Sequence, residues 1–265
     1  MLFRSYSLYG TSGGGRENTA VGSYALYSNS GIGNTAIGYR TLYANTNGTD
    51  NVAVGWRSLE YNTLGYSNIG IGRTALQYNT TGYENIAIGD DSASSNQTGN
   101  YNISLGYSSL GRNTTGGNNI ALGVTSLYYN STTSYNIALG AYAGRYAVGS
   151  VPHYSGSNSI FIGYDTRPDA DSQTNQIVIG HAAVGNGSNT TTIGNSSTTN
   201  TKLFGTLTTT GDASINGLTA GRGGGNQSTN TVVGTGALYS NTTGIGNTAI
   251  GNNSLFYNLD GSTNV

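Results

Sequence analysis

Short apolar groups return at a nearly constant interval of about 17 residues through most of this chain. Each group has the form Asn-(Thr/Ile/Val)-Ala-(Ile/Val/Leu)-Gly, and the unit continues x-x-(Ala/Ser)-Leu-x-x-Asn-Thr-Thr-Gly-x-x. Repetition at this period indicates a solenoid, in which each unit packs only against its neighbours. The first-position asparagines are Asn18, Asn34, Asn51, Asn68, Asn85, Asn102, Asn119 and Asn136, and the series resumes at Asn230 and Asn247.

The apolar group of each unit predicts a short β-strand. Ile86-Ala87-Ile88 is too short for a helix, is rich in β-branched residues and is followed by glycine. A second short strand is expected over the Ala/Ser-Leu part of the unit, as at Ser58-Leu59 and Ala75-Leu76. The Asn-Thr-Thr-Gly segment would then turn the chain back. Each unit is therefore predicted to form one flat coil of two strands and two turns, stacked about 4.8 Å from the next.

Asparagine also recurs at the twelfth position of the unit, where stacked amides can bond along the solenoid axis and to the turn backbone. Asparagine further tolerates the left-handed conformation that tight turns require. The glycine three residues later is expected to need a positive φ. The twelfth-position asparagines are Asn29, Asn45, Asn62, Asn79, Asn96, Asn113 and Asn130, and the glycines are Gly48, Gly65, Gly82, Gly99 and Gly116.

The two faces of the predicted strand are both uncharged. The second and fourth positions, such as Ile69 and Ile71, face one way, while the small third position, such as Ala87, faces the other. A strand that is apolar on both faces is expected to be buried on both, and a thin coil covers only one of them. We therefore expect the other face to meet further copies of the chain, most simply around a three-fold axis.

The repeat divides the chain into successive segments. The register breaks at Val148 to Tyr154, which predicts a protruding loop, and the last groups of the first array lie 17 and then 14 residues apart. Asn264-Val265 resembles the opening of another unit, so the chain is expected to continue. The predicted segments are a lead-in at 1–17, a β-roll array at 18–194 with an insertion at about 145–157, a Thr/Gly-rich β neck at 195–229 and a second array at 230–265.

Composition excludes several classes of partner. The net charge is −1 and only 8 % of residues are charged, so the basic surface typical of nucleic-acid binding is missing. The chain has no cysteine for disulfides or thiolate metal sites. No apolar run is long enough for a signal peptide or a membrane span, so we expect no membrane insertion of this segment.

Three features together resemble bacteriophage tail fibres and, more distantly, the head domains of trimeric autotransporter adhesins. They are the Asn-Thr-Ala-Ile-Gly coils, the closing segment from Ser159 to Gly194, and the Thr-Gly-Asp-Ala-Ser-Ile-Asn-Gly-Leu neck at 210–218. The resemblance implies an all-β, left-handed parallel β-roll that forms an intertwined homotrimer. It also implies a virion fibre or an extracellular location, and a role in reaching and binding a cell surface.

The aromatic residues are the candidate contact surface. The chain has 21 tyrosines, and they cluster at the sixth, tenth and eleventh positions of the unit. Exposed aromatic ladders can stack on the sugar rings of a surface glycan, or they can cap the coil edges and pack between protomers. The candidate contacts with a cell-surface glycan or protein receptor are Tyr39, Trp56, Tyr61, Tyr78, Tyr107 and Tyr128.

No catalytic, cofactor or metal site is predicted. Asp165, Asp169 and Asp171 with Arg167 indicate a solvated loop, because paired catalytic carboxylates need a cleft and a raised pKa on one partner. The same holds for Asp90-Asp91. The two histidines, His153 and His181, are isolated in the sequence. An enzyme is therefore not expected.

Three functional hypotheses follow. The first is a non-enzymatic homotrimeric fibre segment of a phage tail or similar appendage, and the second is the head of a trimeric cell-surface adhesin anchored elsewhere. The third, an enzyme, has no group of catalytic residues to support it, and a less favoured alternative is ice binding by a flat, threonine-bearing solenoid. Ice binding needs threonines two residues apart on one strand face, whereas pairs such as Thr80-Thr81 are adjacent in a turn and should diverge.

Overall fold

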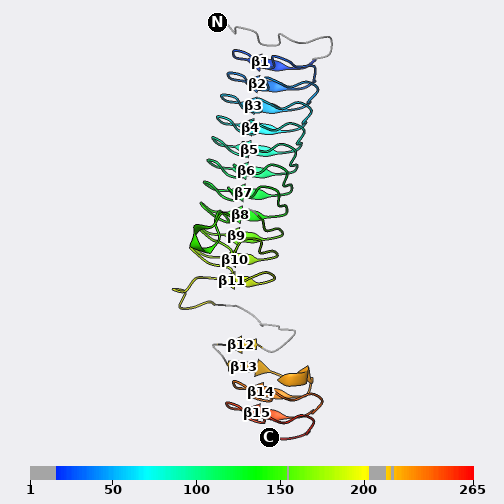
Figure 1. The fold of residues 1–265 in the computed structure, drawn as a ribbon, viewed down its shortest axis with the longest axis vertical. Coiled ribbons are helices and arrows are strands. Elements are labelled where there is room, and N and C mark those ends of the chain that lie inside the picture. The colour runs from blue at the N-terminus through cyan, green and yellow to red at the C-terminus, as the bar shows by residue number, and fades with distance from the viewer. Residues whose placement is uncertain (1–15, 154, 203–212, 216–217) are drawn as a thin grey trace. The chain divides into compact units, whose positions relative to one another are not determined.

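The computed structural model describes residues 16–153, 155–202, 213–215 and 218–265, and the chain divides into two compact units, Met1–Thr201 and Lys202–Val265. The first unit is a stack of coils that each add one strand to a parallel, 11-stranded sheet in sequence order (Figure 1). The all-β parallel solenoid with a spacing of about 17 residues is thus confirmed. Its strands are β1 (Thr19–Val21), β2 (Thr35–Ile37), β3 (Val52–Val54), β4 (Ile69–Ile71), β5 (Ile86–Ile88), β6 (Ile103–Leu105), β7 (Ile120–Leu122), β8 (Ile137–Leu139), β9 (Ile160–Ile162), β10 (Ile177–Ile179) and β11 (Thr191–Ile193).

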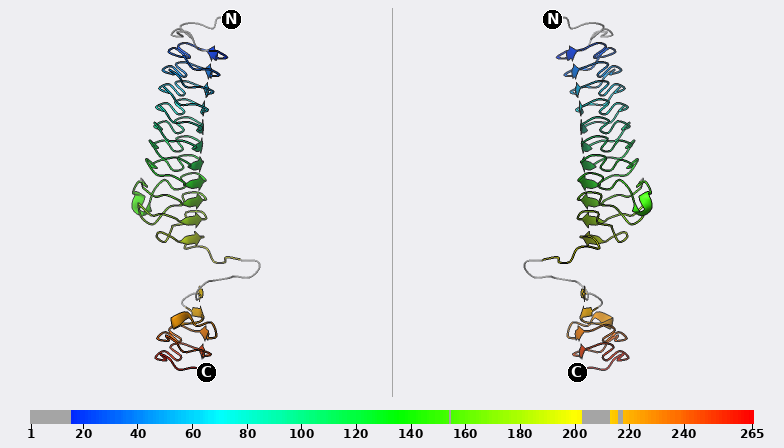
Figure 2. Two further views of the ribbon diagram at one scale, coloured as in Figure 1. Left: turned by 90° about the vertical axis from the view of Figure 1, so that its right-hand side faces the viewer. Right: turned by 90° about the vertical axis from the view of Figure 1, so that its left-hand side faces the viewer.

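Strands pair through equivalent positions of successive units. Ile69 pairs with Ile86 and Gly70 with Ala87, so side chains at equivalent positions stack along the axis. The predicted shortening of the last unit is also present, since Ile177 of β10 pairs with Thr191 of β11. Figure 2 shows the strands along one side of the first unit and the turns on the other.

The core is one layer of small and medium-sized side chains. Third-position alanines such as Ala53 and Ala87 face ninth-position leucines such as Leu59 and Leu76, and all four are fully buried. In the first unit, coils with leucine at the ninth position carry only glycine, alanine or serine at the third position, because the thin core leaves room for no larger residue opposite the leucine. Phe161 is the largest buried side chain, and it lies where Gly144 and Ala183 leave space in the neighbouring coils.

The opposite face of the sheet is apolar and exposed. Second- and fourth-position side chains point outward, as the alternation predicts, and Ile37, Ile71 and Ile88 are 40, 36 and 41 % exposed. No charged residue occupies either position in β1–β11. The chain itself therefore buries only one face of its apolar strands.

No coil forms the predicted second strand in the residues that the structure describes, so that prediction was wrong. Ser58-Leu59 and Ala75-Leu76 lie in turns, because Leu59 and Leu76 both have a left-handed φ of 50°. Residues of alternating handedness curl the backbone instead of extending it. The curled segment still bonds from coil to coil, with the amide of Leu59 donating to the carbonyl of Ala75 at 2.9 Å.

The expected conformation of the turn residues was also wrong. Within the described ranges, none of the first- or twelfth-position asparagines has a positive φ, nor do Gly48, Gly65, Gly82, Gly99 and Gly116. The reason for glycine is close approach instead. A Cβ at Gly82 would lie 2.4 Å from Oδ1 of Asn79 and 2.5 Å from the carbonyl oxygen of Gly99. Positive φ belongs to the glycines that end the strands, such as Gly72 at 135°.

The insertion and the second unit complete the described chain. The insertion contains the short 3-10 helix η1 (Val148–Ser150) and protrudes on the side away from the strands (Figure 2).

In the second unit, β13 pairs antiparallel with β12 and β14, and β14 pairs parallel with β15. The lead-in up to residue 15 and the neck residues 203–212 and 216–217 lie outside the described residues. The remaining elements are β12 (Ala213–Ile215), β13 (Leu218–Gly221), η2 (Gly224–Asn226), β14 (Thr231–Val233) and β15 (Thr248–Ile250).

Candidate functional site

Two asparagine ladders run through the turns of the first unit. Nδ2 of Asn79 donates to Oδ1 of Asn62 at 2.7 Å and to the carbonyl of Gly82 at 2.8 Å. First-position asparagines bond similarly, with Nδ2 of Asn68 donating to Oδ1 of Asn51 at 3.1 Å. These side chains are buried, so their amides are satisfied by one another and by the turn backbone. The ladders hold the coils together. Any ligand would have to bind to surface residues outside them.

The six aromatic residues named from the sequence do not form one patch. Tyr39 stacks on Trp56, with ring centroids 6.4 Å apart, and Tyr61 stacks on Tyr78 at 5.4 Å. Tyr107 is 52 % exposed, and the part of the chain that the structure describes gives it no aromatic partner. Tyr128 lies edge-on to Tyr129. The structure thus yields two stacked pairs and two tyrosines further along the axis.

Arginines accompany these rings, a feature that the sequence analysis missed. The guanidinium of Arg57 lies 4.9 Å from the centroid of Trp56, and that of Arg112 lies 5.2 Å from the centroid of Tyr129. Such contacts are favourable cation–π interactions. The recurrence of arginine at the seventh position in Arg40 and Arg57 was the available signal. Together the rings and arginines make the turn side of the coils aromatic and hydrogen-bonding.

A buried carboxylate links three coils and was also missed. Glu60 is fully buried, and its Oε1 lies 2.8 Å from Nε of Arg40. Its Oε2 accepts hydrogen bonds from Arg57 and, at 2.8 Å, from Nε2 of Gln77. A buried charge that is paired on both oxygens is a structural clamp, because removing a partner would leave it uncompensated.

A second tyrosine row lies in the turns that precede the strands. Tyr66 stacks on Tyr83 with centroids 4.7 Å apart, and Tyr101 lies edge-on to Tyr83 at 5.3 Å. A hydrogen bond to Tyr83 and the nearby charge of Glu84 raise the pKa of Tyr101. The hydroxyl of Tyr101 therefore stays neutral over the physiological range and acts as a hydrogen-bonding group.

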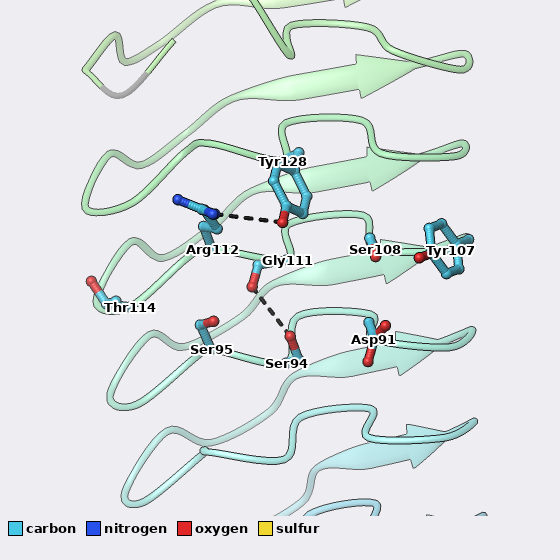
Figure 3. Close-up of a pocket in the computed structure, with 9 residues that line it drawn as sticks. All are labelled: Asp91, Ser94, Ser95, Tyr107, Ser108, Gly111, Arg112, Thr114 and Tyr128. Carbon is cyan, nitrogen blue, oxygen red and sulfur yellow. Dashed lines mark hydrogen bonds between the residues drawn. The ribbon is translucent and has the colours of Figure 1, made fainter. Parts of the chain in front are cut away.

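A notch interrupts the aromatic surface between Tyr78 and Tyr128. We call it the Ser95 notch; it has a volume of about 550 Å³ and is lined by residues from the coils of β5, β6 and β7. Figure 3 shows Ser94 and Ser95 below Gly111, with Tyr128 above it and Arg112 beside them. Ser94 Oγ donates to the carbonyl of Gly111 at 3.3 Å.

The acidic residues named from the sequence have structural partners. Asp165 pairs with Arg167, and Oδ1 of Asp171 accepts from the amide of Ser155 at 3.0 Å. Asp169 accepts from the amide of Gly187 at 3.1 Å. Over the described ranges, no group of three or more acidic, histidine or cysteine side chains could hold a metal ion.

His153 belongs to the insertion, and its side chain is buried. Its Nδ1 is 3.2 Å from the carbonyl oxygen of Gly144, and its ring meets Phe161 edge-on at 5.7 Å. Burial lowers the pKa of His153, while the bond to Gly144 and the charge of Asp171 act in the opposite direction. The histidine is therefore part of the packing that fixes the insertion to the coils.

Stability is expected to fall as the pH drops from about 7 through the lowered pKa of folded His153. In the unfolded chain the imidazole of His153 binds a proton near its ordinary pKa of about 6.5, whereas in the folded chain it stays neutral to lower pH. The free energy of unfolding therefore falls by at most about 1.4 kcal/mol for each unit by which the pH drops. Urea unfolding across this pH range measures it. A His153→Gln variant should lose this part of the dependence, whereas an unchanged slope would show that another group titrates.

Comparison with known proteins finds no matching family, no similar curated protein and no similar solved structure. Within the described residues, no helix is long and apolar enough to cross a membrane. Functional inference for this chain therefore rests on three surface features: the exposed apolar strand face, the aromatic–arginine side of the coils and the Ser95 notch.

Proposed function

We propose that this chain is a non-enzymatic segment of a homotrimeric, left-handed β-roll fibre, such as a bacteriophage tail fibre, that supports attachment to a cell surface. One observation carries the proposal: the exposed, uncharged row of branched side chains along β1–β11. The half-buried Val52 and Ile69 and the exposed Ile71 and Ile88 belong to it. An apolar surface that continues over many coils marks an interaction site.

A second copy of the chain is the partner that fits this face. From β3 to β10 the row presents one pair of apolar side chains per coil, so a partner must have the same axial repeat to match it along its length. A second copy of the chain has the same axial repeat because it has the same sequence. The number three comes from the resemblance to trimeric fibres rather than from the geometry of one chain.

The asparagine ladders suit the mechanical role of a fibre. From Asn45 to Asn113, each twelfth-position amide bonds to the coil before it and the coil after it. Stretching the stack would break one such bond per coil in each ladder together with the strand pairing. Stability thus comes from axial hydrogen bonding as well as from the thin apolar core.

The threonines favour a fibre over an ice-binding surface. Oγ1 of Thr63 donates to the carbonyl of Thr80 at 2.9 Å, and Oγ1 of Thr80 donates to that of Gln97 at 3.0 Å. These hydroxyls are engaged in joining coils. A regular array of threonine hydroxyls directed at an ice lattice would need them to be free.

The double variant Ile71→Lys/Ile88→Lys is expected to convert the assembly into single chains. Both side chains point away from the core, so each coil should still form, while the face gains two charges per protomer that cannot be desolvated cheaply. Sedimentation velocity measures the change in mass, and circular dichroism checks the fold.

The matched control is Ile32→Lys/Leu64→Lys. These residues are 44 and 52 % exposed and lie in turns rather than on the strand face. The control should keep the mass of the unsubstituted protein. If the Ile71/Ile88 variant also keeps that mass, the strand face is not the interface between protomers.

A further inference from the structure

The Ser95 notch arises from a break in two rows of large side chains. The eleventh position carries tyrosine in the coils on either side of it, at Tyr61, Tyr78 and Tyr129. Between them stand Ser95 and, one coil on, Arg112. At the tenth position the corresponding small residues are Ser94 and Gly111, followed by Tyr128. Because equivalent positions stack along the axis, these small residues leave a hollow in the surface.

The wall of the notch is fixed in place by Gly111. A Cβ at this position would lie 2.8 Å from Cε2 of Tyr128, so glycine lets the ring approach the coil beneath it. Nε of Arg112 reaches the hydroxyl of Tyr128 at 3.5 Å, and its guanidinium lies 5.5 Å from the ring centroid. The hollow is thus preformed in the free chain, which lowers the cost of binding.

The lining offers both hydrogen-bond donors and acceptors. Asp91 contributes a carboxylate held by Thr74 and by Arg73, whose Nη2 lies 3.5 Å away. Ser94, Ser95 and Arg112 add hydroxyl and guanidinium groups, and the exposed ring of Tyr107 lies at the far side (Figure 3). Acceptors, donors and an aromatic ring around one hollow suit a ligand that is rich in hydroxyl groups and has an apolar ring face.

We propose that the Ser95 notch binds one pyranose unit of a cell-surface polysaccharide. The sugar hydroxyls would bond to Asp91, Ser94 and Arg112, and a C–H face of the ring would pack on an aromatic side chain. A volume of about 550 Å³ lies in the usual range of small-molecule sites, about 300–1,000 Å³. The inference rests on the proposed role in surface attachment and names the ligand class and the place on the coil.

The test fills the notch without disturbing the repeat. Ser95→Tyr places at the eleventh position the residue that four other coils of the first unit carry there, at Tyr61, Tyr78, Tyr129 and Tyr146. Ala44→Tyr makes the same kind of change at the same position three coils away and serves as the control. The probes are the methyl glycosides of glucose, galactose, N-acetylglucosamine and glucuronic acid. Saturation-transfer NMR measures the binding of each one.

The unsubstituted protein and Ala44→Tyr should bind at least one glycoside with a dissociation constant of about a millimolar. Ser95→Tyr should weaken that binding at least about tenfold, and Asp91→Asn should weaken it without filling the hollow. Equal binding by Ser95→Tyr and the unsubstituted protein would place the sugar elsewhere and overturn the proposal. The absence of binding to every probe would overturn it as well.

A parallel measurement separates this proposal from the wider function. The fluorescently labelled chain is mixed with a panel of bacterial cells and its retention is counted by flow cytometry. Retention on cells without binding of any glycoside would overturn the sugar site and leave the attachment role intact. Glycoside binding without retention on any cell would support the notch and contradict the attachment role.

Discussion

Replacing Asn79 by alanine is expected to lower the free energy of unfolding by about 3 kcal/mol. The substitution removes two bonds donated by Asn79, to Asn62 and Gly82, and the bond that it accepts from Asn96 at 2.7 Å. All of these groups are buried, so each loses about 1 kcal/mol of hydrogen-bond free energy with no water to replace it. Urea unfolding of the purified chain measures the loss.

The control for this change is Asn47→Ala. Asn47 lies two residues after a ladder asparagine, but its side chain is exposed. Its loss should alter stability by no more than about 0.5 kcal/mol. If Asn79→Ala costs as little as Asn47→Ala, the ladders do not hold the coils together.

Gly82→Ala is expected to destabilise the first unit by a similar amount, about 3 kcal/mol. The new Cβ would lie 2.4 Å from Oδ1 of Asn79 and 2.8 Å from Nδ2 of Asn96, so two ladder side chains would have to move. Overpacking of this kind costs about 1–3 kcal/mol, and broken ladder bonds add to it. Thermal unfolding followed by circular dichroism checks the result.

Gly149→Ala provides the comparison for the glycine account. Gly149 has a φ of 76°, and a Cβ there would meet nothing within 4 Å. This variant bears only the conformational cost, about 1 kcal/mol. A loss at Gly82→Ala no larger than that at Gly149→Ala would show that close approach is not the reason for glycine in this turn.

The solenoid and the direction of its strand side chains could be predicted from the sequence. A small residue between two branched ones, as in Ile86-Ala87-Ile88, fixes which side faces a thin core, because the side-chain period of a strand is two. The phase kept by the asparagines likewise places them in stacked rows. Repetition supplies this information because every unit repeats the same packing problem.

The backbone conformation of the turns could not be predicted from the sequence. Leu59 and Leu76 have a left-handed backbone conformation, although this region of φ is unfavourable for leucine. Local preference predicts an extended strand there, and burial of the leucine against the third-position alanine overrides it. The glycine of the turn was assigned to the wrong cause for a related reason, since its neighbours in space, Asn79 and Gly99, belong in part to the next coil.

The candidate sites were visible only in part. Single tyrosines could be named, but the Ser95 notch depends on what is missing at equivalent positions of adjacent coils. Aligning the tenth and eleventh positions would have shown the small residues Ser94, Ser95 and Gly111 among tyrosines. No sequence pattern indicated that Glu60 is buried and paired, because its partners Arg40 and Gln77 come from the coils on either side.

The fibre account joins these features. In the proposed fibre, the apolar strand face would join protomers, the asparagine ladders would stiffen the stack, and the aromatic–arginine side of the coils would meet a cell surface. Each role uses a different side of the same unit, so repeating the unit extends all three together. An outward-facing row such as Ile71 and Ile88 would otherwise remain in water at every coil.

The mass of the purified chain in solution tests the central claim most directly. Light scattering coupled to size exclusion gives that mass without assumptions about shape. The account predicts three times the mass of one chain, which is 27.2 kDa. A stable monomer at micromolar concentration, with its isoleucine face open to water, would contradict it.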